Sequence, residues 1–274
     1  MLGYRYLCDW FDVSPAGYYK WCSRRESERD KENRTLSAKI ERIFYAQHTN
    51  YGSPRIHKVL QQRGERVNHK RVERLMREMG LVGKAGRVYR QKALAKRFYA
   101  KLPNLKKDLP IPTAINQQWV GDLTYLSVNG QKRYLATVMD LYSRRILGWS
   151  LGKQKTAELT RAALKKALRH RTIKAGLIFH TDRGPEYGAY LIQNELEQAG
   201  IKPSMNRPYK VTDNAHMESF FQTMKTECIR EVHFKTEHEL RMTLSWYLND
   251  YYNKRRLHSS IDYTSPVDYE KMAA

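Results

Sequence analysis

The chain has few cysteines and no long apolar segment, and both absences exclude classes of protein. Its three cysteines, Cys8, Cys22 and Cys228, lie far apart and form no CxxC pair. Neither a disulfide framework nor a cysteine-ligated zinc site is therefore predicted. No run approaches the roughly 18 apolar residues that read as a membrane span. The first residues, MLGYRYLCDWFDV, also lack the pattern of a signal peptide, so we expect a cytoplasmic protein.

Acidic residues are scarce: 28 Asp and Glu stand against 50 Lys and Arg, which gives a formal net charge of +22. Such an excess predicts a polyanionic partner, above all nucleic acid, with a basic structural protein as the alternative. The imbalance is concentrated in residues 1–110, with 26 basic and 11 acidic residues. Residues 84–107 contain nine basic residues and no acidic one. We interpret residues 84–112 as a basic linker between two parts of the chain.

The first part of the chain has helical periodicity. In residues 1–50, Tyr4, Leu7 and Phe11 recur at helical spacing, and Ser14-Pro15 is a typical start of a second helix. Residues 51–83 predict two helices joined by a tight turn, as in a DNA-binding helix-turn-helix. A helical hairpin with a solvated basic face is an equally favoured alternative. The candidate DNA-binding residues here are Arg55, Lys70, Arg71, Arg74 and Arg77.

The period changes to that of strands after residue 117. The segments QQWVGDLTYLSV and KRYLATVMDLYS flank Asn129-Gly130, a strong hairpin signal, and RRILGWSL predicts a third strand. Helices and short strands then alternate, with a longer helix over residues 213–230. This order predicts an α/β fold for residues 113–274, a ribonuclease-H-like core with a mixed five-stranded sheet and a C-terminal helical extension.

Three carboxylates stand out against this predicted core. Asp122 lies inside an apolar strand, where a charge is costly unless it is paired or bound to a cation. Asp182 follows the strand AGLIFHT, and Glu218 lies on the long helix with 35 residues between it and Asp182. Neighbouring strands would bring the two aspartates to one end of the sheet. The alternative is that all three are ordinary surface pairs and caps.

The set of motifs resembles a known family. Asp122, Asp182 and Glu218 resemble the DDE triad of transposases and retroviral integrases. The stretches YGSPRIH, WVGDLTYL, HTDRGPEY, DNAHMESFFQTMKTE and YNKRRLHSSIDYTSPVDY resemble the OrfB-type transposases of the insertion-sequence-three family, in order along nearly the whole chain. Family members often have serine at position 181 and Ser-Gln where this chain has Pro185-Glu186. The departure leaves the proposed ligands in place and adds one negative charge.

The resemblance implies a catalytic transposase subunit. Asp122, Asp182 and Glu218 would hold two Mg²⁺ ions, with Mn²⁺ able to substitute, because hard cations of this kind prefer oxygen ligands. The reaction would be strand cleavage at element ends followed by strand transfer, with double-stranded end and target DNA as partners. Further expected partners are other copies of the chain on DNA and an upstream OrfA-type product carrying a helix-turn-helix and a zipper, free or fused to this chain.

Other residues resemble supporting positions of the family, each with an ordinary structural alternative. Lys225 resembles a lysine that contacts element-end DNA, and the alternative is a solvated lysine. Asn214 would support the site or cap a helix, and His180 would orient a ligand or pack. Asn253, Arg256 and His258 fit a C-terminal YN..R.H pattern, for which we favour structural bonding or contact with the DNA backbone.

Two rival functions remain open from the sequence. The first is a nuclease of the same fold that only hydrolyses DNA. The second is a non-catalytic DNA-binding regulator or transposase remnant that uses the basic helices alone. Strand-transfer products from a pre-cleaved end would separate the first rival, and metal-dependent nicking would exclude the second.

Overall fold

The computed structural model describes residues 13–22, 27–84, 102–107, 109–173, 175–208 and 211–273. The chain divides into two compact units, Met1–Gly83 and Lys84–Ala274. The predicted first helix, around Tyr4 to Phe11, and most of the predicted basic linker lie outside the described residues. Within the described ranges, no helix has both the length and the apolar character needed to cross a membrane.

The N-terminal unit is helical. Asn68 caps its last helix, with the side-chain Oδ1 accepting a hydrogen bond of 2.8 Å from the backbone N–H of Lys70. Ser14 likewise accepts from the N–H of Gly17 at 3.0 Å, at the start of the first described helix. Among the described residues of this unit, the helices are α2 (Pro15–Cys22), α3 (Glu28–Ala46), α4 (Ser53–Gln62) and α5 (His69–Glu78).

Helix α3, which the sequence analysis did not predict, completes the core under α4 and α5. It contacts both helices, and Ile40 and Ile43 on α3 are fully buried, as are Ile56 on α4 and Val72 on α5. A two-helix hairpin leaves an apolar stripe exposed on each helix, so a third helix is needed to cover it. The finer division of this unit at residues 50 and 51 stays a prediction.

The C-terminal unit is built on a five-stranded mixed sheet with strand order β3-β2-β1-β4-β5. The first three strands form an antiparallel meander. It turns at Asn129 (φ 45°) and Gly130 (φ 74°), which both take the left-handed conformation that a tight hairpin requires. β4 and β5 are parallel to β1. The strands are β1 (Gln118–Val128), β2 (Gln131–Asp140), β3 (Ile146–Gly152), β4 (Ile178–Thr181) and β5 (Lys202–Met205).

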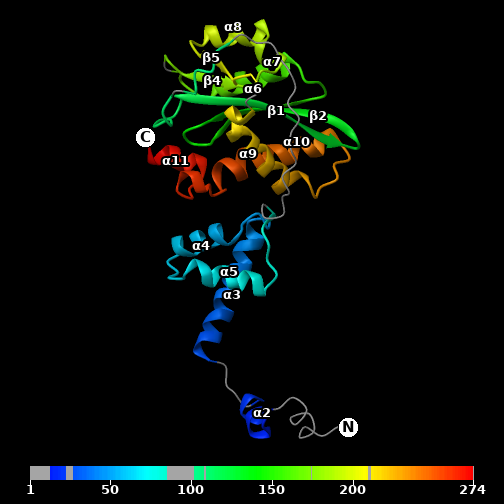
Figure 1. Cartoon of the computed structure of the whole chain (residues 1–274). Helices are drawn as coiled ribbons and strands as arrows, with labels where there is room; N and C mark the ends of the chain where they lie inside the picture. The colour runs from blue at the N-terminus through cyan, green and yellow to red at the C-terminus, as the bar shows by residue number, and fades with distance from the viewer. Residues whose placement is uncertain are drawn as a thin grey trace. The chain divides into compact units, whose positions relative to one another are not determined.

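Helices cover both faces of this sheet, α6 to α8 on one side and α9 and α10 on the other (Figure 1). The face under α6 and α8 buries Trp119, Phe179 and Leu164 in one apolar cluster. The opposite face packs Val120 against Met217 and Phe221 of α9 in a second cluster. These helices are α6 (Ala157–Arg169), α7 (Pro185–Gly188), α8 (Tyr190–Gln198), α9 (Ala215–Met224) and α10 (Glu237–Ser245).

The predicted long helix over residues 213–230 is present but not uniform. A 3₁₀ turn precedes α9, and a π-helical segment follows it. The C-terminal extension contains a second π-helical segment and a terminal helix. The sequence predicted a helical extension here but not the type or bounds of its helices. These segments are η2 (Val211–Asn214), η3 (Lys225–Ile229), η4 (Trp246–Tyr252), η5 (Ser259–Ile261) and α11 (Pro266–Met272).

Close packing of α6 on the sheet depends on Gly148 in β3. A Cβ at this position would lie 2.2 Å from the carbonyl oxygen of Ala163 and 2.7 Å from the backbone nitrogen of Ala167, both on α6. We expect Gly148→Ala to lower the free energy of unfolding by about 1–3 kcal/mol, the usual cost of overpacking. Urea unfolding followed by tryptophan fluorescence checks this. An unchanged midpoint would show that α6 does not approach β3 so closely.

Candidate active site

The two candidate aspartates lie side by side at the ends of neighbouring strands. β1 and β4 are parallel, and Gly121 of β1 is paired with Thr181 of β4. Asp122 and Asp182 each follow these paired residues by one position, so their backbones are separated by about one strand spacing, roughly 4.8 Å. Side chains alternate along a strand, so Asp122 shares a face of the sheet with Val120, two residues earlier, which belongs to the same apolar cluster as Met217 and Phe221 of α9. Asp122 therefore lies on the face that α9 covers, and Asp182 lies in the turn that follows β4.

Glu218 comes to the same side of the sheet from α9. The start of α9 is tied to β1, because Asn214 Nδ2 donates a hydrogen bond of 3.2 Å to the carbonyl oxygen of Gly121, the residue before Asp122. Glu218, four residues further on, is exposed. In the described ranges, no three His, Cys, Asp or Glu side chains are close enough to share a metal ion. The structure therefore brings the aspartates together and leaves Glu218 beside them.

Charge repulsion and burial act on Asp122. Its pKa is raised well above the usual range, first by burial and then by the negative charge of Asp182. The backbone N–H of Leu123, 2.7 Å from Asp122 Oδ1, and the charge of Lys155 oppose this rise in pKa, while Glu218 adds a smaller repulsion. Partial desolvation by the surrounding protein raises the pKa of the Glu218 carboxyl. Asp122 and Asp182 are thus the strongly interacting pair, a charge arrangement that favours a bound cation.

The turn after β4 holds Asp182 against the backbone. The Oδ1 atom of Asp182 accepts a hydrogen bond of 3.0 Å from the N–H of Gly184. A Cβ at Gly184 would lie 3.0 Å from that same oxygen and 2.2 Å from Oε1 of Glu186. Glycine at this position therefore lets two carboxylates approach one stretch of backbone. The Asp-Arg-Gly turn thus positions an acidic side chain at the strand end.

The donor chemistry of this site fits a hard divalent cation. Asp122, Asp182 and Glu218 supply only oxygen ligands, the type that Mg²⁺ prefers. Two further buried oxygens close by, Oδ1 of Asn214 and Oε2 of Glu186, have no hydrogen-bond partner among the described residues. A buried acceptor without a partner is costly. The site therefore holds more negative and acceptor groups than the protein itself satisfies.

Lys225 lies near the aspartates and above an aromatic ring. Its Nζ is 4.9 Å from the ring centre of Tyr125 on β1, and Lys132 Nζ lies 5.5 Å from the same ring. Burial lowers the pKa of Lys225, and Arg230 lowers it further, whereas the charge of Asp122 raises it. Tyr125 is 60% exposed. Tyr125 and Lys132 were not among the predicted site residues, and the signal for Tyr125 in the sequence was an aromatic residue three positions after Asp122 in the same predicted strand.

His180 is a buried packing residue in this structure. Its Nδ1 lies 2.9 Å from Ser204 Oγ, and its Nε2 lies 2.8 Å from Asn206 Oδ1. Burial first, and then the charge of Lys106, lower its pKa to about 4. The neutral ring joins β4 to the end of β5, and both of its nitrogens already have partners within the protein.

The C-terminal motif residues are also buried and bonded within the protein. Asn253 accepts from the N–H of Ile146 and donates to its carbonyl oxygen, both at 2.9 Å. Arg256 is 4% exposed and pairs with the fully buried carboxylate of Glu227 at 2.7 Å. His258 is buried and packs edge-on against Tyr252. These contacts tie the C-terminal extension to the core.

Three of the five basic residues chosen in the N-terminal unit pair with carboxylates of that unit. Arg71 bonds Glu32 at 3.0 Å, Arg74 bonds Glu78 at 2.8 Å, and Arg77 lies 3.5 Å from Glu73. Arg55 lies over the ring of Tyr51 at 5.7 Å. Lys70 is exposed near the start of α5, and no described carboxylate pairs with it.

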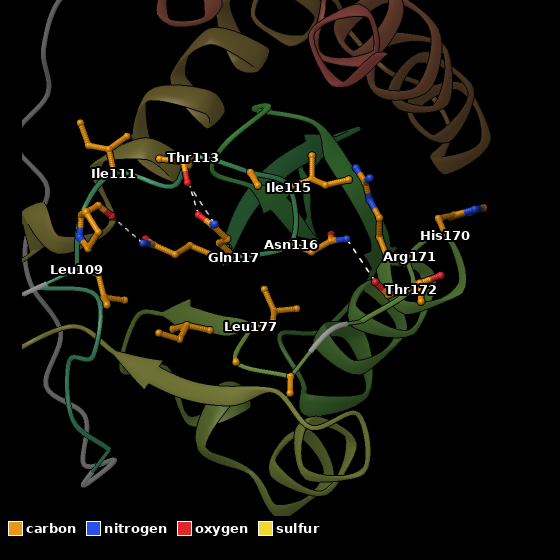
Figure 2. Close-up of a pocket in the computed structure, with 16 residues that line it drawn as sticks. Leu109, Ile111, Thr113, Ile115, Asn116, Gln117, His170, Arg171, Thr172 and Leu177 are labelled. Carbon is orange, nitrogen blue, oxygen red and sulfur yellow. Dashed lines mark hydrogen bonds between the residues drawn. The ribbon is translucent and has the colours of Figure 1, made fainter. Parts of the chain in front are cut away.

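The hollow drawn in Figure 2 belongs to the other end of the parallel strands. This cavity of about 850 Å³ is lined by the segment before β1, by the loop after α6 and by the first residue of β4, Ile178. At the wall of this cavity, Asn116 Nδ2 donates a hydrogen bond of 3.5 Å to the carbonyl oxygen of Thr172. Asp122 and Asp182 follow the C-terminal ends of the β1–β4 ladder, so the cavity is not the carboxylate site.

Comparisons with protein families cover both units. Residues 112–211 match the family described as Integrase core domain, and residues 199–266 match a second family with the same description. Residues 30–90 match the family described as HTH-like domain. The HTH-like match covers most of α3 as well as the two helices predicted from the sequence.

Named relatives match along nearly the whole chain. The transposase for insertion sequence element IS904 of Lactococcus lactis subsp. lactis (strain IL1403) is 39% identical over 248 residues, 90% of this chain and 98% of that protein. Transposase InsF for insertion sequence IS3A of Escherichia coli (strain K12) is 34% identical over 266 residues, 96% of this chain and 92% of that protein.

A solved structure shares the fold at low sequence identity. A chain of the simian T-cell lymphotropic virus intasome in complex with PP2A regulatory subunit B56 gamma has a TM-score of 0.50 and 17% identity, covering 62% of this chain and 59% of that one. With the family matches, the fold defines an integrase-core protein of the transposase class. The chain belongs to the OrfB-type transposases of the insertion-sequence-three family.

Proposed function

We propose that this chain catalyses metal-dependent DNA strand cleavage at insertion-sequence ends and the strand transfer that follows, in the bacterial cytoplasm at the nucleoid. The observation that carries the proposal is the adjacency of Asp122 and Asp182 after the paired residues of β1 and β4. Glu218 on α9 is the third carboxylate, beside this pair. A nuclease that stops after hydrolysis, and a non-catalytic regulator, are the functions against which it is tested.

The carboxylates would hold two Mg²⁺ ions, with Mn²⁺ able to substitute. Two such ions supply Lewis-acid stabilisation of the oxygens exchanged at phosphorus and lower the pKa of an attacking hydroxyl. Asp122 and Asp182 are fixed by backbone N–H groups, and Glu218 would complete the ligand set. No protein nucleophile is needed, because the attacking group is water or the free 3′-hydroxyl of DNA.

DNA would be bound by two separate parts of the chain. Near the carboxylates, Lys225 and Lys132 flank the exposed ring of Tyr125, a combination of cations and aromatic surface that suits phosphates and unstacked bases. In the N-terminal unit the exposed Lys70 is the second residue of α5, the second helix of the motif. Such helices contact the major groove with their N-terminal residues.

Lys70 provides a test of the DNA-binding face of the N-terminal unit. We expect Lys70→Ala to weaken binding of the full chain to duplex DNA and to reduce the slope of log K against log salt by about 0.9, the contribution of one phosphate contact. Arg74→Ala is the matched control, because Arg74 is already paired with Glu78. Fluorescence anisotropy at several salt concentrations gives both slopes. Equal slopes for wild type and Lys70→Ala would remove Lys70 from the interface.

The competent assembly would contain more than this chain alone. A reaction at two element ends needs at least two catalytic subunits, so we propose a homo-oligomer on DNA. We also propose that an upstream OrfA-type product, free or fused by frameshifting, supplies a further helix-turn-helix and zipper. Specific binders usually discriminate by a factor of about a thousand or more. If the isolated chain reaches that ratio on terminal-repeat DNA, the upstream product is not required for recognition.

Catalysis itself is tested by metal-dependent nicking. Purified full-length chain, with the OrfA-type product or fused to it, is incubated with duplex DNA carrying an element end, with Mg²⁺, with Mn²⁺ and with EDTA. We expect nicks at the element boundary with either metal and none with EDTA. Binding without nicking under all three conditions would favour the non-catalytic regulator and reject the proposal.

A further inference from the structure

A fourth carboxylate and a lysine lie next to the two aspartates. Lys155 Nζ is 2.7 Å from Oε1 of Glu186, whose side chain is 1% exposed, while that of Lys155 is 41% exposed. Lys155 comes just before α6, and Glu186 lies on α7 in the turn after Asp182. The pair therefore joins two loops at the C-terminal end of β4, where Asp182 lies.

Glu186 reaches the aspartate site through the space that Gly184 leaves. Oε1 of Glu186 and Oδ1 of Asp182 lie 2.2 Å and 3.0 Å from the position of a Gly184 Cβ, so both oxygens occupy the same side of that backbone. Oε2 of Glu186 is buried and has no hydrogen-bond partner among the described residues. A buried carboxylate with one oxygen unsatisfied is costly unless a cation or another donor compensates it.

Lys155 responds electrostatically to the whole acidic group. Burial lowers its pKa, but the hydrogen bond and charge of Glu186, followed by the charges of Asp182 and Asp122, outweigh burial and raise it. In turn Lys155 lowers the pKa of Asp122. The buried hydroxyl of Tyr187 faces the same charges, since burial, Asp122, Asp182 and Glu186 all raise its pKa. Asp122, Asp182, Glu186 and Lys155 thus form one electrostatic cluster of three carboxylates and one ammonium group.

We propose that Lys155 and Glu186 are a charge-balancing pair that sets the divalent-cation affinity of the Asp122–Asp182 site. Glu186 adds a negative charge that attracts the cation, and Lys155 adds a positive charge that opposes it. Neither side chain would contact the cation directly. Each would change its affinity through the electrostatic potential at Asp122 and Asp182. The inference rests on the proposed function, because it takes the aspartates as the metal ligands.

The proposal predicts changes of opposite sign for the two partners. A unit charge roughly 6 Å from a divalent ion in an aqueous dielectric changes its affinity by about tenfold. We therefore expect Lys155→Met to lower the dissociation constant for Mn²⁺ by about tenfold and Glu186→Gln to raise it by about tenfold. The double variant should return to the wild-type value, because the two charges are removed together.

The experiment is calorimetric titration of Mn²⁺ into the full chain without DNA, so the readout does not depend on activity. Lys153→Met and Glu197→Gln are matched controls, because they remove the same charges from exposed positions near the start of α6 and on α8. Both controls should bind Mn²⁺ as wild type does. If Lys155→Met does not fold, Lys155→Gln replaces it, and Lys155→Arg should keep the wild-type affinity.

Two different results would overturn the inference. A wild-type chain that binds no Mn²⁺ would remove both the metal site of the proposed function and this pair's role in it. A wild-type chain that binds Mn²⁺, with both single variants within twofold of it or both shifted in the same direction, would leave the metal site standing. In that case Lys155 and Glu186 would form only a structural ion pair.

Discussion

Asp122→Asn and Asp182→Asn proteins are expected to bind duplex DNA like the wild type and to lose at least about 1000-fold of the metal-dependent cleavage rate. A factor of this size corresponds to about 4 kcal/mol of transition-state stabilisation, within the range that metal ions supply. The amide keeps the size of the side chain but removes the charge that holds the cation. Glu218→Gln is expected to behave in the same way.

The same substitutions carry a second, independent expectation. Because Asp122 and Asp182 repel one another, removing either charge should leave thermal stability in EDTA unchanged or higher. A rate loss with retained stability would then separate chemistry from misfolding. Asp250→Asn is the control, since this aspartate pairs with Lys254 on an exposed helical surface. Any triad variant that keeps cleavage within tenfold of wild type removes that residue from the triad.

Arg256→Met is expected to lower the free energy of unfolding more than Gly148→Ala does. Arg256 Nε lies 3.1 Å and 2.9 Å from the two carboxylate oxygens of Glu227, and Nη2 lies 2.7 Å from Oε1. Tyr247 donates a further hydrogen bond of 2.8 Å to Glu227 Oε2. Both charged side chains are almost completely buried. Removing the arginine leaves a buried carboxylate without its counter-ion, which typically costs about 3–5 kcal/mol.

A loss of this size should appear as a fall of about 10 °C in the melting temperature of the C-terminal unit. The double variant Arg256→Met with Glu227→Gln should recover a large part of it, because no unpaired charge then remains buried. Differential scanning calorimetry of the full chain measures both. A single variant within about 1 kcal/mol of wild type would show that the pair does not hold the C-terminal extension to the core.

The sequence predicted the adjacency of Asp122 and Asp182 because two local patterns combine. Period-two apolar segments located the strands, and the parallel pairing of their ends followed from the order of the elements. It did not predict α3, although Leu36, Ile40 and Ile43 have helical spacing, because polar residues outnumber the apolar ones on this surface helix. The five candidate DNA-binding residues of the N-terminal unit were selected by charge alone. Charge could not show which of the arginines pair with carboxylates of the same unit.

Ion pairs between residues far apart in the chain could not be predicted from the sequence. Lys155 and Glu186 form an ion pair because the start of α6 and the turn after β4 lie at the same end of the strands. No local sequence pattern predicts that contact. The pairing of Arg256 with Glu227 joins the C-terminal extension to a π-helical segment after α9 in the same way. The resemblance to the family marked Arg256 and Asn253 as notable, but only burial and bonding distances distinguish a structural side chain from one that meets DNA.

Strand transfer from a pre-cleaved end is the decisive assay for the proposed function. The full chain, with the OrfA-type product or fused to it, is given a duplex whose element end already carries a free 3′-hydroxyl, together with target DNA and Mg²⁺. The account predicts covalent joining of that 3′ end to target DNA, lost with EDTA and in the Asp182→Asn protein. Joining that persists in Asp182→Asn, or nicked DNA without any joined product, would contradict it.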